Sequence, residues 1–297
     1  MNQALKAKRQ ILAAQIALKR TQNNEVQLQR TLSQFFKKLS DEVLKNLEEY
    51  WSETQLLQGQ IKLILQPITD SEEQYNKILE QYIRREYKLG IREAQRLVNL
   101  TINKQAHKSI FDTLRKNVKI NATRTNLFGT LEDAEEELLN RVFNASKRTL
   151  ARVTEDINVI LTKGYTSGKG INIVAQAMTT RFQQLETWEA RRIARTEIHN
   201  AHNNAVMRTY ETLGVEYTRW NAADDDRTRE SHAELDGEII RMGDTYSNGL
   251  AYPGDTSGDI EEWINCRCSN APFVMPLGMM APPDMEQFRE EDLIPIS

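Results

Sequence analysis

Hydrophobic residues recur every three or four positions through most of the first 215 residues, the spacing of one face of an α-helix. We expect the first long helix to end before Pro67, because proline lacks a backbone N–H and breaks helices. Its apolar stripe consists of Leu28, Leu32, Phe35, Leu39, Val43, Leu47 and Tyr50. Further runs predict helices from Ser71 to about Gly90, over 91–126, from Thr130 to Gly164, over 173–182 and over 187–213.

The pattern changes after Gly214, where glycine typically ends a helix. Residues 215–220 alternate and carry valine, threonine and aromatic side chains, which predicts a β-strand. Asp236-Gly237 is a hairpin-type turn before Ile239 and Ile240, and Trp220 is expected in the core of this region. The C-terminal part therefore contains a small β-sheet.

These patterns predict a mainly helical α+β fold with three parts. Residues 1–165 form a helical arm and helical hairpins, 166–276 form a helix-plus-sheet unit, and 277–297 form a tail rich in proline and methionine. The distribution of proline supports this division, since Pro67 is the only proline before Pro253.

Charge is distributed unevenly along the chain. Residues 1–40 contain eight basic residues and one acidic residue, a net charge of +7, in a chain whose formal net charge is −3. Such an arm is suited to DNA phosphates or to an acidic protein surface. The basic residues are Lys6, Lys8, Arg9, Lys19, Arg20, Arg30, Lys37 and Lys38.

Two features concern the compartment of the protein. The chain has two cysteines, Cys266 and Cys268, which are too few for a disulfide framework and favour a reduced intracellular setting. No window of about 18 apolar residues occurs, so no membrane span is expected.

Cys266 and Cys268 stand two residues apart, so on an extended segment their side chains project to the same face. They are candidates to bind one soft metal ion with His232 as a third ligand. The fourth ligand could come from Asp226, His199 or His202. The alternative is that both cysteines are small buried hydrophobic residues and that His232 is a hydrogen-bonded loop residue.

Charged residues near this candidate site predict an ion-pair network. It would connect the last long helix to the charged loop after the strand and comprises Arg195, Glu197, Asp226, Arg227 and Arg229. The functional alternative is a carboxylate with arginines around a phosphate. A structural network is the commoner reason for such pairs, and we favour it.

The order of motifs from about residue 170 to 275 resembles the phage Mu F-like head morphogenesis family, the minor head proteins of tailed phages. The ordered set covers about a third of the chain and consists of Arg195-Thr196-Glu197, Gly214, Trp220, Asp226-Arg227-Thr228-Arg229, His232, Gly237, Pro253-Gly254-Asp255 and Asn265-Cys266-Arg267-Cys268. In this family phenylalanine is common shortly after the glycine turn, and Tyr246 is expected to take that role.

The resemblance implies a minor head protein that associates with the portal inside the capsid. Such a protein acts in procapsid assembly in the host cytoplasm and contacts packaged double-stranded DNA or capsid and scaffold proteins. The resemblance implies neither an enzyme nor a small-molecule substrate. It also favours zinc as the metal at Cys266, Cys268 and His232.

Two other classes of function remain open at this point. One is a metal-dependent nuclease or nucleotide-processing enzyme, which needs carboxylates and histidines converging on an open metal position. Its candidate residues are Glu197, His199, Asp224, Asp226 and His232. The other is a host-encoded nucleic-acid-binding module left by a prophage.

Overall fold

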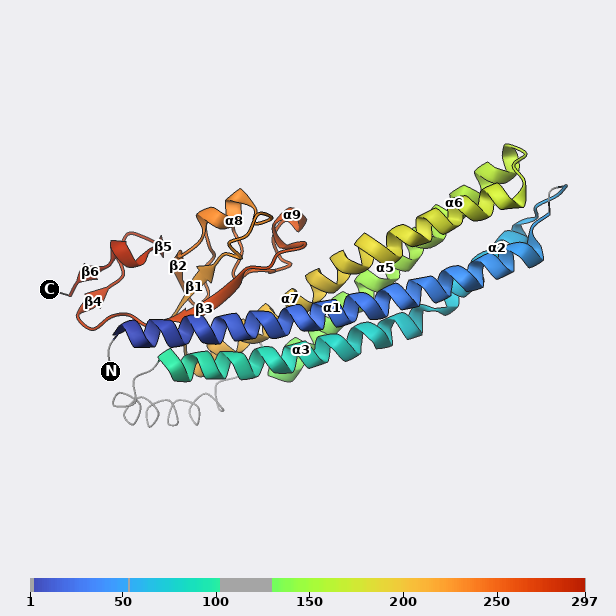
Figure 1. Cartoon of the computed structure of the whole chain (residues 1–297). Coiled ribbons are helices and arrows are strands. Elements are labelled where there is room, and N and C mark those ends of the chain that lie inside the picture. The colour runs from blue at the N-terminus through green and yellow to red at the C-terminus, as the bar shows by residue number, and fades with distance from the viewer. Residues whose placement is uncertain (1–2, 53, 102–129, 297) are drawn as a thin grey trace. The chain divides into compact units, whose positions relative to one another are not determined.

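Helices dominate the structure, a computed structural model that describes residues 3–52, 54–101 and 130–296, with side chains described from Lys19 onward (Figure 1). The predicted mainly helical α+β fold is confirmed. The prediction of helix over 91–126 holds as far as Thr101, and 102–126 lie outside the described residues. The long helices are α1 (Gln3–Tyr50), α2 (Gln58–Asp70), α3 (Glu72–Thr101), α5 (Leu131–Thr166), α6 (Ile171–Gln184) and α7 (Ala190–Leu213).

The residues pack into two compact units, each of which combines segments distant in sequence. The helical unit comprises Glu25–Tyr82 and Leu138–Ala194. The mixed unit comprises Met1–Asn24, Ile83–Glu137 and Arg195–Ser297. Several long helices contribute residues to both units, whereas the sequence predicts one boundary at residue 165. The predicted division of the chain at residue 165 stays a prediction.

The apolar stripe predicted for the first helix forms the core of the helical unit. Leu28, Leu32 and Phe35 are buried, and the Phe35 ring stacks on Tyr75 with 5.1 Å between ring centroids. A π-helical turn, η1 (Leu185–Glu189), joins α6 to α7. The buried carboxylate of Glu189 in this turn accepts hydrogen bonds from Arg181, at 2.7 Å, and from Arg152. These charge-assisted bonds satisfy a group that would otherwise be costly to bury.

Pro67 lies inside α2 and does not mark the end of helical structure. A proline at this position leaves the carbonyl of Leu63, four residues earlier, without its helical donor. Asn46 replaces that donor, because its Nδ2 donates to the Leu63 carbonyl oxygen at 2.8 Å. The cost of the proline is thus reduced by a contact that sequence spacing does not reveal.

Gly90 does not end α3, which continues to Thr101. A Cβ atom at Gly90 would lie 2.7 Å from the backbone oxygen of His202 and 2.8 Å from Cβ of Ala205. The glycine therefore allows α3 and α7 to approach closely within the mixed unit. The alanine-rich face of α7 serves the same approach, since Ala201 and Ala205 are fully buried.

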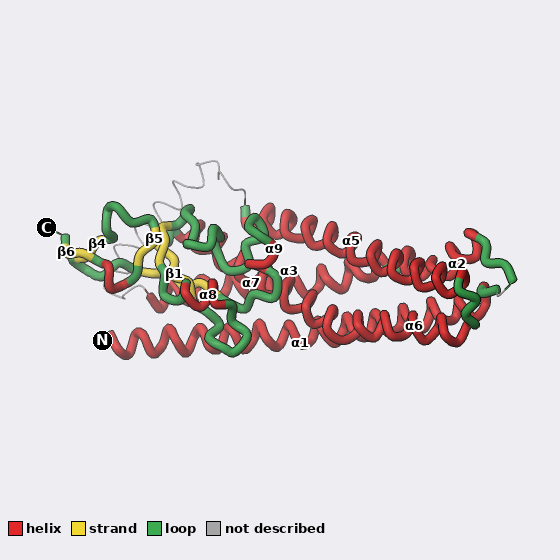
Figure 2. The backbone as a smooth tube through the Cα atoms, turned by 90° about the horizontal axis from the view of Figure 1, so that it is seen from above, coloured by secondary structure: helices red, strands yellow, loops and turns green. Residues whose placement is uncertain are grey.

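An antiparallel four-stranded sheet in the mixed unit has the order β3-β1-β2-β5. In Figure 2 the strands lie among the loops of the C-terminal part. Trp220 on β1 is fully buried, as predicted. The strands and short helices are β1 (Tyr217–Asn221), α8 (Glu230–Glu234), β2 (Ile239–Arg241), α9 (Ile260–Trp263), β3 (Ser269–Phe273), β4 (Met279–Met280), β5 (Gln287–Phe288), η2 (Glu290–Asp292) and β6 (Ile294–Pro295).

The segment predicted as a tail, 277–297, contributes to this sheet. Phe288 on β5 is buried and contacts the Tyr217 ring edge-on, with 5.7 Å between ring centroids. Ile239 pairs with Phe288 in the antiparallel register of β2 and β5. The proline and methionine content of this segment concealed one large aromatic anchor, and its assignment as a separate tail stays a prediction.

We predict that Gly90→Ala destabilises the protein by about 1–3 kcal/mol, because the added methyl group overpacks a backbone contact. The matched control is Gly59→Ala in α2, where a Cβ atom meets nothing within 4 Å. That change is expected to be neutral or stabilising, because alanine favours helix over glycine. Chemical unfolding of both variants measures the difference. Equal unfolding midpoints would contradict the close approach at Gly90.

Candidate metal centre

The sheet brings the two halves of the candidate centre together. His232 lies on α8, in the connection between β1 and β2, whereas Cys266 and Cys268 immediately precede β3. Strand β1 pairs with both β2 and β3, and its last residue, Asn221, is opposite Ser269. The register therefore places the end of β1 beside the cysteines. The connection that follows β1 then returns toward the cysteines, so that His232 lies close to them.

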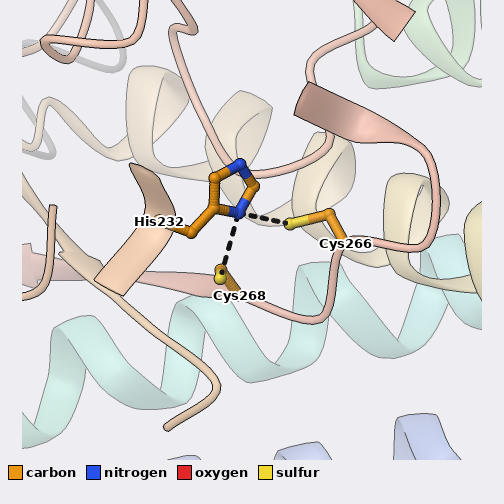
Figure 3. Close-up of side chains that lie close together, drawn as sticks. All are labelled: His232, Cys266 and Cys268. Carbon is orange, nitrogen blue, oxygen red and sulfur yellow. Dashed lines mark hydrogen bonds between the residues drawn. The ribbon is translucent and has the colours of Figure 1, made fainter. Parts of the chain in front are cut away.

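Figure 3 shows the His232 ring pointing toward both sulfur atoms. Its Nδ1 atom is 3.6 Å from Sγ of Cys266 and 3.5 Å from Sγ of Cys268. All three side chains are buried, and the edge-on Trp220 ring lies 5.2 Å from the His232 ring. The convergence predicted from the sequence for these three residues is present in the structure, and their ligand atoms lie within 4.8 Å of one another.

These distances can be compared with the geometry of tetrahedral zinc. With Zn–S bonds of about 2.3 Å and Zn–N bonds of about 2.0–2.1 Å, a nitrogen and a sulfur ligand are separated by about 3.5–3.6 Å. The separations from Nδ1 to the two sulfur atoms agree with that value. The donor set of two thiols and one imidazole also suits a soft or borderline metal. The three side chains therefore form a group that could hold a metal ion.

The two thiols differ in acidity because one donates a hydrogen bond to the other. The pKa of Cys268 is lowered because Cys266 donates a hydrogen bond to its sulfur, and this effect outweighs the opposing effect of burial. The pKa of Cys266 is raised by the same hydrogen bond and by burial. The pair thus already favours one thiolate, and thiolate is the form that binds metal.

The three candidates for a fourth ligand do not join this group in the described part of the chain. Asp226 is exposed and pairs with Arg227 at 3.7 Å. His202 contacts Glu86, with 3.0 Å between Nδ1 and Oε1, and His199 is buried on α7. The same placements separate the carboxylates and histidines that a nuclease centre would need to bring together.

The residues of the predicted ion network lie partly in an exposed loop and partly on α7. Arg227 is largely exposed with its partner Asp226, and Arg229 donates to the backbone oxygen of Ile264. Arg195 and Glu197 lie on α7, where Glu197 is buried. Asp226 and Arg227 therefore pair at the surface, and a common network of all five residues stays a prediction.

Other polar contacts attach α7 to the cysteine segment, and these were not predicted. The backbone N–H of Asn265 donates to Oγ1 of Thr196 at 3.1 Å. Asn203 Nδ2 donates to the backbone oxygens of Cys268 and Pro253, each at 2.9 Å. Thr196 is the central residue of the Arg-Thr-Glu motif, which was the available sequence signal. Asn203 lies between Ala201 and Ala205 on the buried face of α7, and no sequence motif pointed to it.

Asp225, rather than Asp226, carries the charge pair of the loop after β1. Arg267 donates to both carboxylate oxygens of Asp225, one of them at 2.6 Å. The Arg267 guanidinium lowers the pKa of Asp225. This bidentate pair holds the loop against the residue between the two cysteines.

A buried polar cluster lies at the root of the basic arm. Glu86 on α3 is fully buried and accepts hydrogen bonds from Thr21, at 2.9 Å, and from Asn24, both on α1. Burial alone would raise the pKa of Glu86, but the hydrogen bonds from His202, Asn24 and Thr21 lower it overall. His202 thus serves to hold α1, α3 and α7 together within the mixed unit.

The arm residues themselves lie on α1. Lys6, Lys8 and Arg9 belong to its first turns, before the part of the helix whose side chains are described. The other five basic residues are exposed, and Lys38 pairs with Glu42 at 3.6 Å. They are Lys19, Arg20, Arg30, Lys37 and Lys38.

Comparison with known proteins defines the class of this region. Residues 155–271 match the family described as "Phage Mu protein F like protein". The predicted resemblance is therefore confirmed, and the chain contains a Mu F-like region that includes the whole candidate metal centre. No solved structure matches the chain.

Two relatives share part of the sequence. The chain is 31% identical over 129 residues to minor head protein GP7 of Bacillus phage SPP1, a match that covers 41% of this chain and 42% of that protein. It is 34% identical over 82 residues to an uncharacterized protein of Haemophilus influenzae, a match over 28% of this chain and 17% of that protein. The chain thus matches less than half the length of either relative. Within the described residues no helix is both long and apolar enough to cross a membrane.

We predict that Glu86→Gln lowers the free energy of unfolding by about 1.5–3 kcal/mol at neutral pH, the usual value for hydrogen bonds to a charged group. Because the folded-state pKa of Glu86 is lowered, its contribution is present above the ordinary glutamate pKa of 4.5 and is lost as pH falls below it. The difference between the wild type and the variant in chemical unfolding should therefore shrink in acid.

The control for this experiment is Glu73→Gln. Glu73 is an exposed residue that pairs with Lys77 along its own helix, and its replacement should leave the unfolding midpoint close to that of the wild type. A difference between the wild type and Glu86→Gln that stays constant in acid would contradict the lowered pKa.

Proposed function

We propose that this protein is a minor head protein of a tailed phage or prophage that associates with the portal and acts in procapsid assembly. The observation that carries this proposal is the Mu F-like match over 155–271 together with the identity to minor head protein GP7. In the same proposal the protein enters the capsid during assembly in the host cytoplasm and remains near the portal in the virion.

We also propose that His232, Cys266 and Cys268 bind one structural zinc ion. The burial of all three residues supports a closed site that stabilises the fold, rather than an open site that presents a metal to a substrate. Zinc bound there would connect the loop after β1 to the segment before β3. The zinc ion would act as a structural cross-link between these two parts of the chain.

The basic arm supports a contact with DNA or with an acidic surface of the portal. Its exposed charges follow α1 without a motif that reads base edges, so binding to DNA would be independent of sequence. The nuclease alternative has no comparable support, because its candidate carboxylates are dispersed between an exposed loop and a buried helix face. A structural role is therefore the function that the geometry favours, without a small-molecule substrate.

Deletion of the gene from the phage or an inducible prophage tests this role directly. We predict fewer infectious particles, heads that lack this protein and heads that still contain the portal. Complementation with the wild-type gene is the control. Normal yields of infectious particles, or a protein that is never recovered in heads, would contradict the proposal.

The DNA contact of the arm is tested by replacing its five exposed basic residues with alanine in the full chain. If DNA is the partner, wild-type binding to double-stranded DNA should fall steeply with salt, because each neutralised phosphate releases a counterion. The variant should bind more weakly, and each lost phosphate contact should reduce the salt slope by about 0.9.

The matched control removes the same number of exposed lysines outside the arm. Its affinity should be close to that of the wild type if the arm makes the contact. Equal losses in the two variants would show attraction by overall charge alone, and a wild type that does not bind DNA would leave an acidic portal surface as the partner. The control positions are Lys45, Lys62, Lys88, Lys163 and Lys169.

A further inference from the structure

His232 uses its second ring nitrogen for a contact outside the sulfur cluster. Its Nε2 atom lies 2.9 Å from Oε2 of Glu262, which is on α9. Glu262 stands four residues before Cys266, and its side chain is 23% exposed. The carboxylate therefore lies on the far side of the imidazole ring from the two cysteines.

The partners of Glu262 indicate which ring nitrogen carries the proton. Asn248 Nδ2 donates to the same Oε2 atom of Glu262 at 3.2 Å. An oxygen that already accepts this hydrogen bond acts as an acceptor toward His232 as well, so Nε2 of the ring is the donor. In the neutral imidazole, Nδ1 then carries the lone pair, and Nδ1 is the atom that faces both sulfurs.

The orientation of the Asn248 amide is fixed in turn by the backbone. Its Oδ1 atom accepts a hydrogen bond from the backbone N–H of Leu250 at 3.2 Å. The amide nitrogen must therefore face Glu262. Leu250 is fully buried in the core that also contains both cysteines, so this chain of contacts is anchored at both ends.

We infer that Glu262, held in place by Asn248, is a positioning residue that fixes His232 with its proton on Nε2 and presents Nδ1 to the metal. This inference rests on the proposed metal site and extends it to residues outside the ligand set. Metal-binding histidines commonly donate their other ring N–H to a carboxylate, and loss of that partner typically weakens metal binding 10–100-fold.

Zinc titration of the full chain against a competing chromogenic chelator tests the inference. Glu262→Ala should weaken zinc binding by about 10–100-fold. Glu262→Gln should retain more affinity than Glu262→Ala, because its amide oxygen can still accept the Nε2–H bond. The matched control is Glu261→Ala, which removes an exposed carboxylate from the same short helix and should leave the affinity unchanged.

A second readout separates positioning from a general loss of stability. In the zinc-bound wild type, the Nε2 proton of His232 should give a slowly exchanging signal in ¹H–¹⁵N NMR spectra. In zinc-bound Glu262→Ala this proton should exchange markedly faster while the amide spectrum stays folded. Unchanged affinity in Glu262→Ala, or unchanged exchange of the Nε2 proton, would overturn the role of Glu262.

The outcome for the wild type distinguishes this failure from failure of the site itself. A wild-type chain that binds no zinc would overturn the proposed metal centre and the inference that depends on it. Tight wild-type binding with equal affinity in Glu262→Ala would leave the centre intact and overturn only the positioning role.

Discussion

The convergence of the His232 ring on the sulfur atoms of Cys266 and Cys268 is the interaction on which the rest of the mixed unit depends. The sheet of this unit is small, and the loops around it place Leu235, Tyr246 and Leu250 in one buried cluster with both cysteines. A structural zinc ion contributes about 10–16 kcal/mol of apparent binding free energy in small domains. That is comparable to the whole stability of a typical domain, about 5–15 kcal/mol. A metal cross-link would therefore outweigh any single hydrogen bond or ion pair in this region.

Helix α7 packs against the segment that carries both cysteines. Thr196 and Asn203 bind the backbone on either side of Cys266. Gly254 provides close approach in the facing loop, where φ is +86° and a Cβ atom would lie 2.5 Å from Oδ1 of Asn200. Small residues on the helix and polar contacts from Thr196 and Asn203 thus hold the cysteine segment against α7.

Patterns that depend on local spacing could be predicted from the sequence. The apolar stripe of α1, the change from helix to strand after Gly214 and the burial of Trp220 all follow from periodicity, and the structure agrees. The grouping of Cys266, Cys268 and His232 was predictable because two cysteines at a spacing of two residues share a face, and few other soft ligands exist in the chain.

Features that depend on contacts distant in sequence were not predictable. The first helix ends before Pro67, as predicted, but spacing does not show that α2 continues through Pro67, because Asn46, which replaces the missing donor, lies on another helix. Gly90 was predicted near a helix end, because its close contact with α7 cannot be recognised from the sequence alone. No pattern in the sequence singles out Glu262, since only the fold brings it to the second nitrogen of His232.

Zinc K-edge absorption of the full-length protein, purified without chelator and combined with elemental analysis, tests the central claim most directly. The account predicts one zinc ion per chain, with two sulfur ligands at about 2.3 Å and a histidine nitrogen at about 2.0–2.1 Å. Protein without stoichiometric zinc after growth in zinc-supplemented medium, or zinc bound by oxygen and nitrogen alone, would contradict it.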